Sequence, residues 1–452
     1  LYGLYKPDEG EIYVKGKKAE IKSPLDSIKL GIGMVHQHFM LVYPHSVAEN
    51  IALGLPSMKF FFPLKEIEKR ISELSEKYGL KVDPKAKIWQ LPVGHQQRVE
   101  ILKALYRRAD ILILDEPTSV LTPTEVKELF ITLKRMAESG CTIIFITHKL
   151  NEVIAISDRV TVLRKGKVIG TLETSKTNEL ELAKMMVGRE VLFKLKGVSV
   201  PKGKIVLEVH DLHALNDKGL LALKGISFKL YEGEILGIAG VAGNGQKELV
   251  ETITGLRRAT KGKVYILGKD MTNHSPREIA EQGVAYIPEE RIRMGIVPNM
   301  NISENLILKK YRYKPFSGKM FLNFSFIAQY SEKLISDYNI ITPSKYIPAK
   351  LLSGGNIQRL ILARELSGEP KLIVAAYPTS GLDVGATEYI RQLLLNQKER
   401  GASILLISED LEEIISLSDR IAVMFEGNIM GILPKESVKI EEVGLMMAGL
   451  KP

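Results

Sequence analysis

Two adjacent carboxylates end an apolar run in this chain, and a later copy of the run has lost both. Asp115-Glu116 ends the first run, and Ala376-Tyr377 stands at the same place in the second. An apolar run that ends in Asp-Glu predicts a buried strand with two carboxylates at the sheet edge where α/β folds bind nucleotides. Asp115 suits a hard cation such as Mg²⁺, and Glu116 suits a base that polarises an attacking water. The alternative is a pair of surface carboxylates that close a strand.

A histidine ends the next apolar run along the chain. His148 follows Thr142–Thr147 directly. Because strands that alternate with helices predict a parallel sheet, we expect His148 beside the carboxylates, where its ring can donate to a γ-phosphate. The alternative is a structural or solvated histidine.

A glycine-rich turn begins a predicted helix in the later half of the chain. Its residues are Ser353, Gly354, Gly355 and Asn356. Backbone N–H groups and the Ser353 hydroxyl can hold an anionic phosphate at a helix N-terminus. The alternative is a plain helix cap followed by a flexible turn.

A second glycine-rich loop follows the apolar run Ile235–Ala239 and precedes a predicted helix. The phosphate-loop pattern Gly-x-x-x-x-Gly-Lys-[Ser/Thr] requires Lys and then a hydroxyl where this chain has Gln246 and Lys247. The loop therefore keeps an amide cradle but lacks the hydroxyl that binds Mg²⁺. The cradle consists of Gly240, Gly243, Asn244 and Gly245.

The whole chain is a duplication. A step of 261 residues carries Asp115 onto Ala376 and His148 onto Glu409. A step of 252 residues carries Gln37 onto Glu289. Repeats of this length indicate two similar α/β domains, which we predict at residues 1–194 and 205–452, with a linker at residues 195–204.

Composition narrows the class of protein. A formal net charge of +10 would suit nucleic acid or an anionic membrane, but the charges are dispersed, which favours a solvated surface. Cys141 is the only cysteine, so no internal disulfide is possible and a reducing cytoplasm is expected. No apolar run approaches the roughly 18 residues that span a bilayer.

The motifs together resemble an ATP-binding-cassette (ABC) ATPase. The resemblance rests on Leu91–Ser119, Gln37, His148 and Leu352–Asn356. It implies an α/β fold of two tandem P-loop NTPase domains, each with a mostly parallel core sheet, an antiparallel β subdomain and a helical subdomain. It also implies ATP and Mg²⁺ as cofactors.

The duplication resembles the fused ATPase subunit of bacterial importers for simple sugars and nucleosides. Arg98–Tyr106 and Gly240–Gln246 resemble the nucleoside-type branch, which pairs with a substrate-binding lipoprotein. The resemblance implies integral-membrane permease subunits as partners, no nucleic acid, and a peripheral place on the cytoplasmic face of the plasma membrane.

The resemblance also implies roles for single residues. Asp115 is the metal-associated carboxylate, Glu116 the catalytic base and His148 the switch histidine. Gln37 senses the γ-phosphate and the metal, and Asp383 reaches across the dimer. Ser353 to Asn356 form the signature turn.

In this family two domains meet head to tail, so the resemblance implies two composite sites. Site one joins Gln37, Asp115, Glu116 and His148 to Ser353, Gly354, Gly355 and Asp383. Site two joins a degenerate set: Gln246, Lys247, Glu289, Ala376, Tyr377 and Glu409 with Pro92, Gly94 and Thr122. We predict hydrolysis at site one only.

Site one also needs a phosphate loop from the first domain. The 252-residue step places it about 12 residues before Leu1, so we expect it upstream of the given sequence. Two other functions stay open: a non-hydrolysing nucleotide-binding module, and a soluble ABC ATPase that acts on ribosomes or nucleic acid. The second usually has a long charged linker and two competent sites.

Aromatic residues gather in the predicted helical subdomains. The first half has Phe60, Phe61 and Phe62, and the second half has Phe316, Phe321, Phe324 and Phe326. Helical subdomains contact permeases in the family, so these side chains either form an interface or pack locally.

Overall fold

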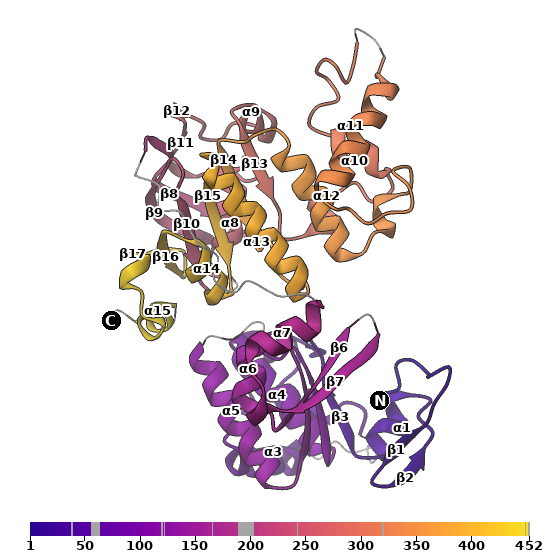
Figure 1. Ribbon diagram of the computed structural model, residues 1–452. Helices are drawn as coiled ribbons and strands as arrows, with labels where there is room; N and C mark the ends of the chain where they lie inside the picture. Colours follow the sequence, from indigo (N-terminus) through magenta and orange to yellow (C-terminus); the bar gives the residue numbers. More distant parts are fainter. Residues whose placement is uncertain are drawn as a thin grey trace. The chain divides into compact units, whose positions relative to one another are not determined.

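The computed structural model describes residues 1–37, 39–55, 64–118, 121, 123–164, 166–188, 203–241, 243–318, 321–447 and 449–450. The chain divides into two compact units, Leu1–Met185 and Met186–Pro452, each coloured by its own part of the sequence in Figure 1. Most of the predicted linker at residues 195–204 lies outside the described residues, so its bounds stay a prediction.

The second unit is built on a six-stranded sheet. Its first five strands run parallel and the last runs antiparallel. Every residue of β10, β14 and β15 is buried, because both faces of the sheet are covered, and this explains their unbroken apolar runs. The order is β13 (Val284–Ile287), β14 (Leu372–Ala376), β15 (Ser403–Ser408), β10 (Ile235–Ala239), β16 (Arg420–Phe425) and β17 (Asn428–Pro434).

Alternate residues of these strands enter two different cores. One face packs on α12 (Gly354–Leu366), α13 (Val384–Glu399), α14 (Leu411–Leu417) and α15 (Ile440–Met447). The other face packs on α8 (Gln246–Ile253), α9 (Pro276–Glu281) and a four-stranded antiparallel sheet. That sheet has the order β12 (Lys269–Asp270), β11 (Lys261–Ile266), β8 (Ile205–Leu215) and β9 (Leu221–Tyr231).

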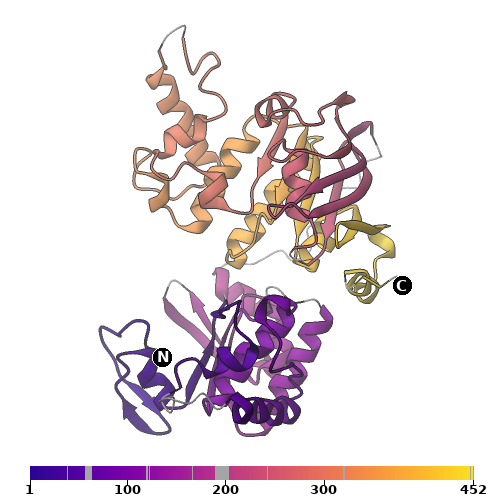
Figure 2. The ribbon, with the colours of Figure 1, turned by 180° about the vertical axis from the view of Figure 1, so that it is seen from behind.

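A helical group completes the second unit. It consists of α10 (Ile302–Ile307), α11 (Phe324–Asp337) and α12, which pack on one another. Figures 1 and 2 show this group at one end of the unit, away from the antiparallel sheet. The second unit therefore contains the three parts that the fold prediction names.

The first unit has a smaller parallel sheet of β3 (Ile32–Val35), β4 (Ile111–Asp115) and β5 (Thr142–Ile146). Two antiparallel pairs accompany it: β1 (Ile12–Val14) with β2 (Lys17–Ala19), and β6 (Arg159–Arg164) with β7 (Lys167–Glu173). The helices are α1 (Pro24–Lys29), α2 (Val47–Ala52), α3 (Leu64–Tyr78), α4 (Val93–Tyr106), α5 (Pro123–Glu138), α6 (Leu150–Ile156) and α7 (Glu179–Val187).

The two sheets differ at one position. In the second unit β10 lies between β15 and β16, whereas no strand among the described residues lies between β5 and β6. The free edge of β5 shows in its burial: Ile146 is 45% exposed, while its counterpart Ile407 in β15 is fully buried. The first unit therefore has room for one more parallel strand at this edge.

Buried asparagines confirm that both units repeat one design. Asn50 accepts a hydrogen bond from the backbone N–H of Val42 and donates to its carbonyl, and Asn305 does the same with Val297. Each asparagine lies in a helix that starts with a capping box. The same network therefore fixes the start of the helical group in each unit.

The aromatic cluster of the second unit divides into two kinds. Phe316 is 7% exposed and stacks edge-on against Phe326 and Tyr330, so local packing explains Phe316 and Phe326. Phe321 and Phe324 are 79% and 73% exposed and stay candidates for an interface. Phe60, Phe61 and Phe62 lie outside the described residues.

The length and hydropathy of the helices bear on membrane insertion. None of those in the described part of the chain is long and apolar enough to cross a bilayer.

Candidate active site

The carboxylates of the first unit lie where β4 ends beside β5. Asp115 is the last residue of β4 and pairs with Ile146. The backbone N–H of Glu116 then donates to the carbonyl of Ile146 over 2.9 Å, with a left-handed φ of 44° at Glu116. This bend ties Glu116 to the end of β5, which leads directly into His148.

Three segments distant in sequence meet on the Glu116 carboxylate. Nδ1 of His148 lies 2.8 Å from Oε1, and Nε2 of Gln37 donates to Oε2 over 3.1 Å. The hydrogen bond from His148 holds the pKa of Glu116 below its usual value, although partial burial opposes this. The carboxylate is therefore ionised and oriented at neutral pH.

A buried glutamate, which sequence reasoning missed, bonds to the segments that carry Glu116 and His148. Glu152 accepts hydrogen bonds from the hydroxyls of Thr118, over 2.8 Å, and Thr147, over 3.1 Å. The second unit has the same pair, since Thr379 donates to buried Glu413 over 2.7 Å. The step of 261 residues from Glu152 to Glu413 was the signal that could have found them.

At the end of the equivalent strand, the second unit has the same backbone conformation but different side chains. Tyr377 has a φ of 48°, and its N–H donates to the carbonyl of Ile407 over 2.8 Å. Burial, with a smaller contribution from Glu409 and then Glu289, raises the pKa of the Tyr377 phenol, which stays neutral. Ala376 is buried and has no side chain that could bind a cation.

A small pocket brings five of the predicted residues of the second unit together, whereas Glu409 does not line it. Tyr377 lies there with Gln246 and Lys247 at the start of α8. Three glutamates and one lysine are the charged residues that line it. The lining residues are Gln246, Lys247, Val250, Glu251, Tyr286, Glu289, Glu290, Met294, Ala376 and Tyr377.

In the phosphate loop of the second unit, a side chain forms a hydrogen bond with the backbone of the loop itself. Gln246 is buried, and its amide donates to the carbonyl of Val241 in the same loop over 3.0 Å. Lys247 instead pairs with Asp217 at 3.5 Å and Glu251 at 3.9 Å. Neither side chain therefore extends over the loop as a phosphate-binding lysine does.

The backbone of that loop has the shape of a phosphate cradle. Gly243 and Gly245 have φ values of 86° and 103°, and Gly245 directly precedes α8. A Cβ on Gly240 would meet the amide of Gln246. The Asn244 side chain accepts from the backbone N–H of Glu426 over 2.9 Å, which holds the loop against the β16–β17 turn.

The signature turn of the second unit starts a helix and is open. Ser353 is the N-cap of α12, and its hydroxyl accepts from the Asn356 amide over 3.0 Å. A Cβ on Gly354 or Gly355 would have no neighbour closer than 3.9 Å. Asp383 is exposed and caps α13 by accepting from the N–H of Ala386 over 2.8 Å.

The equivalent turn of the first unit is altered. Pro92, which has no hydroxyl, precedes α4 where Ser353 precedes α12. Gly94 is buried, and a Cβ there would run into the carboxylate of Glu125. Thr122, predicted opposite Asp383 in the repeat, lies outside the described residues.

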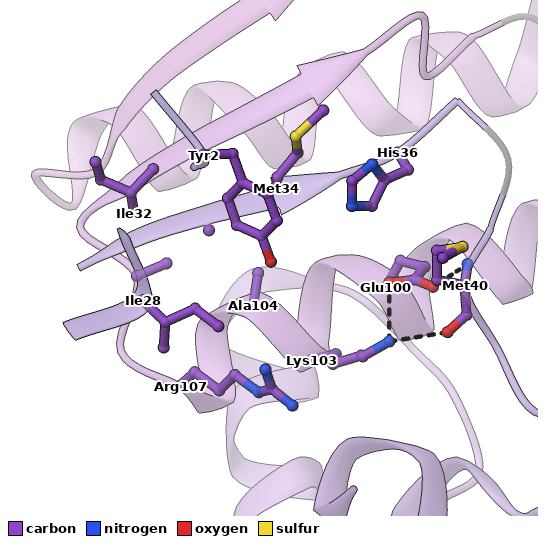
Figure 3. A pocket seen from close by; sticks show the side chains of 12 residues that line it. Tyr2, Ile28, Ile32, Met34, His36, Met40, Glu100, Lys103, Ala104 and Arg107 are labelled. Atoms are coloured by element: carbon purple, nitrogen blue, oxygen red, sulfur yellow. Dashed lines mark hydrogen bonds and ion pairs between the residues drawn. The ribbon is translucent and has the colours of Figure 1, made fainter. Parts of the chain in front are cut away.

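A separate cavity of about 210 Å³ lies between β3 and α4 in the first unit. Figure 3 shows Tyr2 and His36 on one side and Glu100, Lys103 and Arg107 on the other. None of the predicted site residues lines it. Among the described residues, no group of three or more His, Cys, Asp or Glu side chains could hold a metal ion.

Comparison with known proteins shows the family to which the chain belongs. The family model described as "ABC transporter" matches residues 1–119 and 223–380. The nucleoside import ATP-binding protein NupA of Lactococcus lactis is 47% identical over 450 residues, which cover 99% of this chain and 89% of that protein. The guanosine import ATP-binding protein NupO of Bacillus subtilis is also 47% identical, over 99% of this chain and 88% of NupO.

An archaeal relative is similar over the same extent. The glucose import ATP-binding protein TsgD13 of Haloferax volcanii is 45% identical over 480 residues, which cover 99% of this chain and 87% of that protein. Matches of this length include both units, with their parallel sheets and covering helices. The chain therefore belongs to the ABC transporter family, as an ATP-binding protein with two ABC domains in tandem.

Proposed function

We propose that this chain is the ATP-hydrolysing subunit of a bacterial importer for nucleosides or simple sugars. The observation that carries the proposal is the contact of Gln37 and His148 with the Glu116 carboxylate. The names of the relatives NupA, NupO and TsgD13, all import ATP-binding proteins, support the direction of transport.

Glu116 is the general base in this proposal. His148 occupies Oε1 and Gln37 occupies Oε2, yet each carboxylate oxygen keeps a further lone pair. Glu116 can therefore hold the attacking water and accept its proton while both neighbours fix the orientation of the carboxylate. The lowered pKa keeps Glu116 in its ionised form, which is the form that can accept a proton.

Asp115 and Gln37 fit a magnesium ion that arrives with ATP. Gln37 donates through Nε2 to Glu116, which leaves its amide oxygen, and Asp115 adds a carboxylate. Both are the hard oxygen donors that Mg²⁺ prefers, and bound Mg²⁺ neutralises charge on phosphate oxygens. Ala376 offers no such donor in the second unit.

We infer two unequal composite sites. Site one combines Gln37, Asp115, Glu116 and His148 with the second unit's signature turn, Ser353 to Asn356, and Asp383. Site two combines the loop in which Gln246 bonds to Val241 with the altered turn at Pro92, and it does not hydrolyse ATP. Site one also takes a phosphate loop from its own domain, and the free edge of β5 has room for a strand that carries such a loop.

The proposed partners are integral-membrane permease subunits. Solute reaches them from an extracytoplasmic substrate-binding lipoprotein, and the chain works as a peripheral subunit on the cytoplasmic face of the plasma membrane without nucleic acid. Exposed Phe321 and Phe324 suit a contact with the permease.

Reconstitution of the full-length protein with its permease in liposomes tests the proposal. We expect ATP-dependent uptake of a labelled nucleoside or a labelled simple sugar, and the two labels used separately identify the solute class. Nucleotide binding without hydrolysis would contradict the proposal, as would hydrolysis that ribosomes or nucleic acid stimulate and the permease does not.

A further inference from the structure

The second unit has a longer segment after Glu289 than the first unit has after Gln37, its counterpart in the repeat. Gln37 and Val42 are five residues apart, whereas Glu289 and Val297 are eight apart. Both valines bond to the equivalent buried asparagine, so three residues are added between fixed points. The added length forms a π-helical turn, η3 (Arg291–Gly295), in which the N–H of Gly295 reaches the carbonyl of Glu290 over 3.3 Å. Such turns often mark functional sites.

The η3 turn is fixed on α12. Gly295 is buried, and a Cβ there would collide with Ile361 of α12, so the two backbones approach closely. Ile296, the next residue, lies in the core that contains α12. Arg291, at the start of η3, is therefore held over the N-terminal part of α12, where the signature turn lies.

Arg291 contacts two loops that lie side by side. Its Nη2 donates to the carbonyl of Ser380, three residues before Asp383. Its Nη1 lies 3.9 Å from the position that a Cβ on Gly354 would occupy. One guanidinium therefore lies against both the signature turn and the turn that presents Asp383.

This link is additional to a contact that both units share. Gln358 on α12 donates to the carbonyl of Pro378 over 2.8 Å, and Gln97 on α4 donates to Pro117 in the same way. The first unit has no arginine between Gln37 and Val42. The extra guanidinium thus occurs only beside the intact signature turn.

Burial of the Arg291 guanidinium is energetically unfavourable, which indicates a role beyond packing. The Nε atom of Arg291 is buried and has no acceptor among the described residues. Burial also lowers the pKa of the guanidinium. A buried donor without a partner is unfavourable, so packing alone does not account for an arginine here.

We propose that Arg291 is a positioning residue that locks the signature turn at Ser353–Gly355 and the turn before Asp383 into one rigid face for ATP. The proposal rests on the proposed function, because that face completes site one only if the chain hydrolyses ATP there. Arg291 acts through the two turns and takes no part in the chemistry at Glu116.

The test measures kcat and KM for ATP in the full-length transporter. Arg291→Gln removes the bridge, and Arg293→Gln is the matched control, since its side chain is 81% exposed and pairs only peripherally with Glu290. We expect R291Q to raise KM for ATP and to lower kcat/KM roughly 10- to 100-fold, the usual effect of a displaced binding group. R293Q should match the wild type, and both variants should share its Tm.

Equal kcat/KM for R291Q and R293Q would overturn the proposal. So would a loss of kcat at unchanged KM, because fewer folded molecules produce that pattern. If R291Q does not fold, R291K replaces it in the same comparison of KM for ATP. Lysine keeps the charge but contacts one turn at a time, so KM should again rise. Glu116→Gln in the same preparation separates the two claims: retained turnover there contradicts the proposed function, whatever R291Q does.

Discussion

Nδ1 of His148 lies 2.8 Å from Oε1 of Glu116, at the ends of two neighbouring parallel strands. The contact arises from the backbone, because the N–H of Glu116 bonds to Ile146 and so turns the residue toward β5. Tyr377 makes the same backbone bond to Ile407 in the second unit. One scaffold therefore carries an ionised carboxylate in the first unit and a neutral phenol in the second.

This difference predicts that turnover depends on one unit. Glu116→Gln keeps the size of the side chain but removes the base, so we expect kcat of the full-length protein to fall roughly 10²- to 10⁴-fold. Tyr377→Phe, at the equivalent position, should leave most turnover intact. Steady-state ATP hydrolysis measures both, and similar losses at the two positions would contradict a single working site.

A second prediction concerns pH. The His148 hydrogen bond lowers the folded-state pKa of Glu116 below its usual 4.5, so the unfolded chain binds this proton more tightly. The resulting stability is fully present above that value and is lost as pH falls through the folded pKa. His148→Ala removes the bond, so the gap in urea midpoint between wild type and variant should narrow as pH falls from about 5 to 3.

The control for this titration is the same pair of proteins with Glu116→Gln added. Glutamine does not ionise, so the pH-dependent part of the gap should disappear. The chosen range lies below the usual imidazole pKa of about 6.5, which limits the contribution of histidine itself. A gap that stays constant over the range would rule out the linkage between His148 and Glu116.

Sequence reasoning could place the candidate residues at one sheet edge because they end strands. Unbroken apolar runs identify buried parallel strands, and the residues after them must share one edge, as Asp115, Glu116 and His148 do. The repeat step then paired each residue with its counterpart. These are local signals, and the parallel pairing of β4 with β5 brings the two strand ends side by side.

Other features depend on contacts that have no local signal. The return of Gln246 to the carbonyl of Val241 is a side-chain conformation, and sequence shows only that lysine is missing. Phe316 and Phe321 are the same residue type in one aromatic segment, yet Phe316 is buried and Phe321 is exposed. The contact of Arg291 with Ser380 spans 89 residues and follows from how η3 packs on α12.

The aromatic residues give a third prediction, which separates packing from docking. Phe316→Ala empties a buried site and should cost about 3–5 kcal/mol of unfolding free energy in urea titration. Phe321→Ala with Phe324→Ala should leave stability close to that of the wild type, because both side chains are exposed. The double variant should instead reduce co-purification with the permease. Undiminished co-purification would remove these two residues from the interface.

A fourth prediction asks whether two carboxylates would be enough to revive site two. The variant Ala376→Asp with Tyr377→Glu, made in the Glu116→Gln background, restores both acids to the strand end. We expect no recovery of hydrolysis in single-turnover assays, because Gln246 stays bonded to Val241 and Lys247 to Asp217 and Glu251. The new glutamate would also face Glu289, which lines the same pocket, and this repulsion disfavours its ionised form.

The matched addition to this experiment restores the loop as well. Gln246→Lys with Lys247→Thr recreates the pattern that binds phosphate and Mg²⁺. We expect this fourfold variant to bind ATP more tightly than the twofold variant, yet to hydrolyse it slowly, because Pro92 still replaces the signature serine on the opposite face. Full recovery by the two carboxylates alone would show instead that the loop and Pro92 are compatible with hydrolysis, and that site two lacks only its acids.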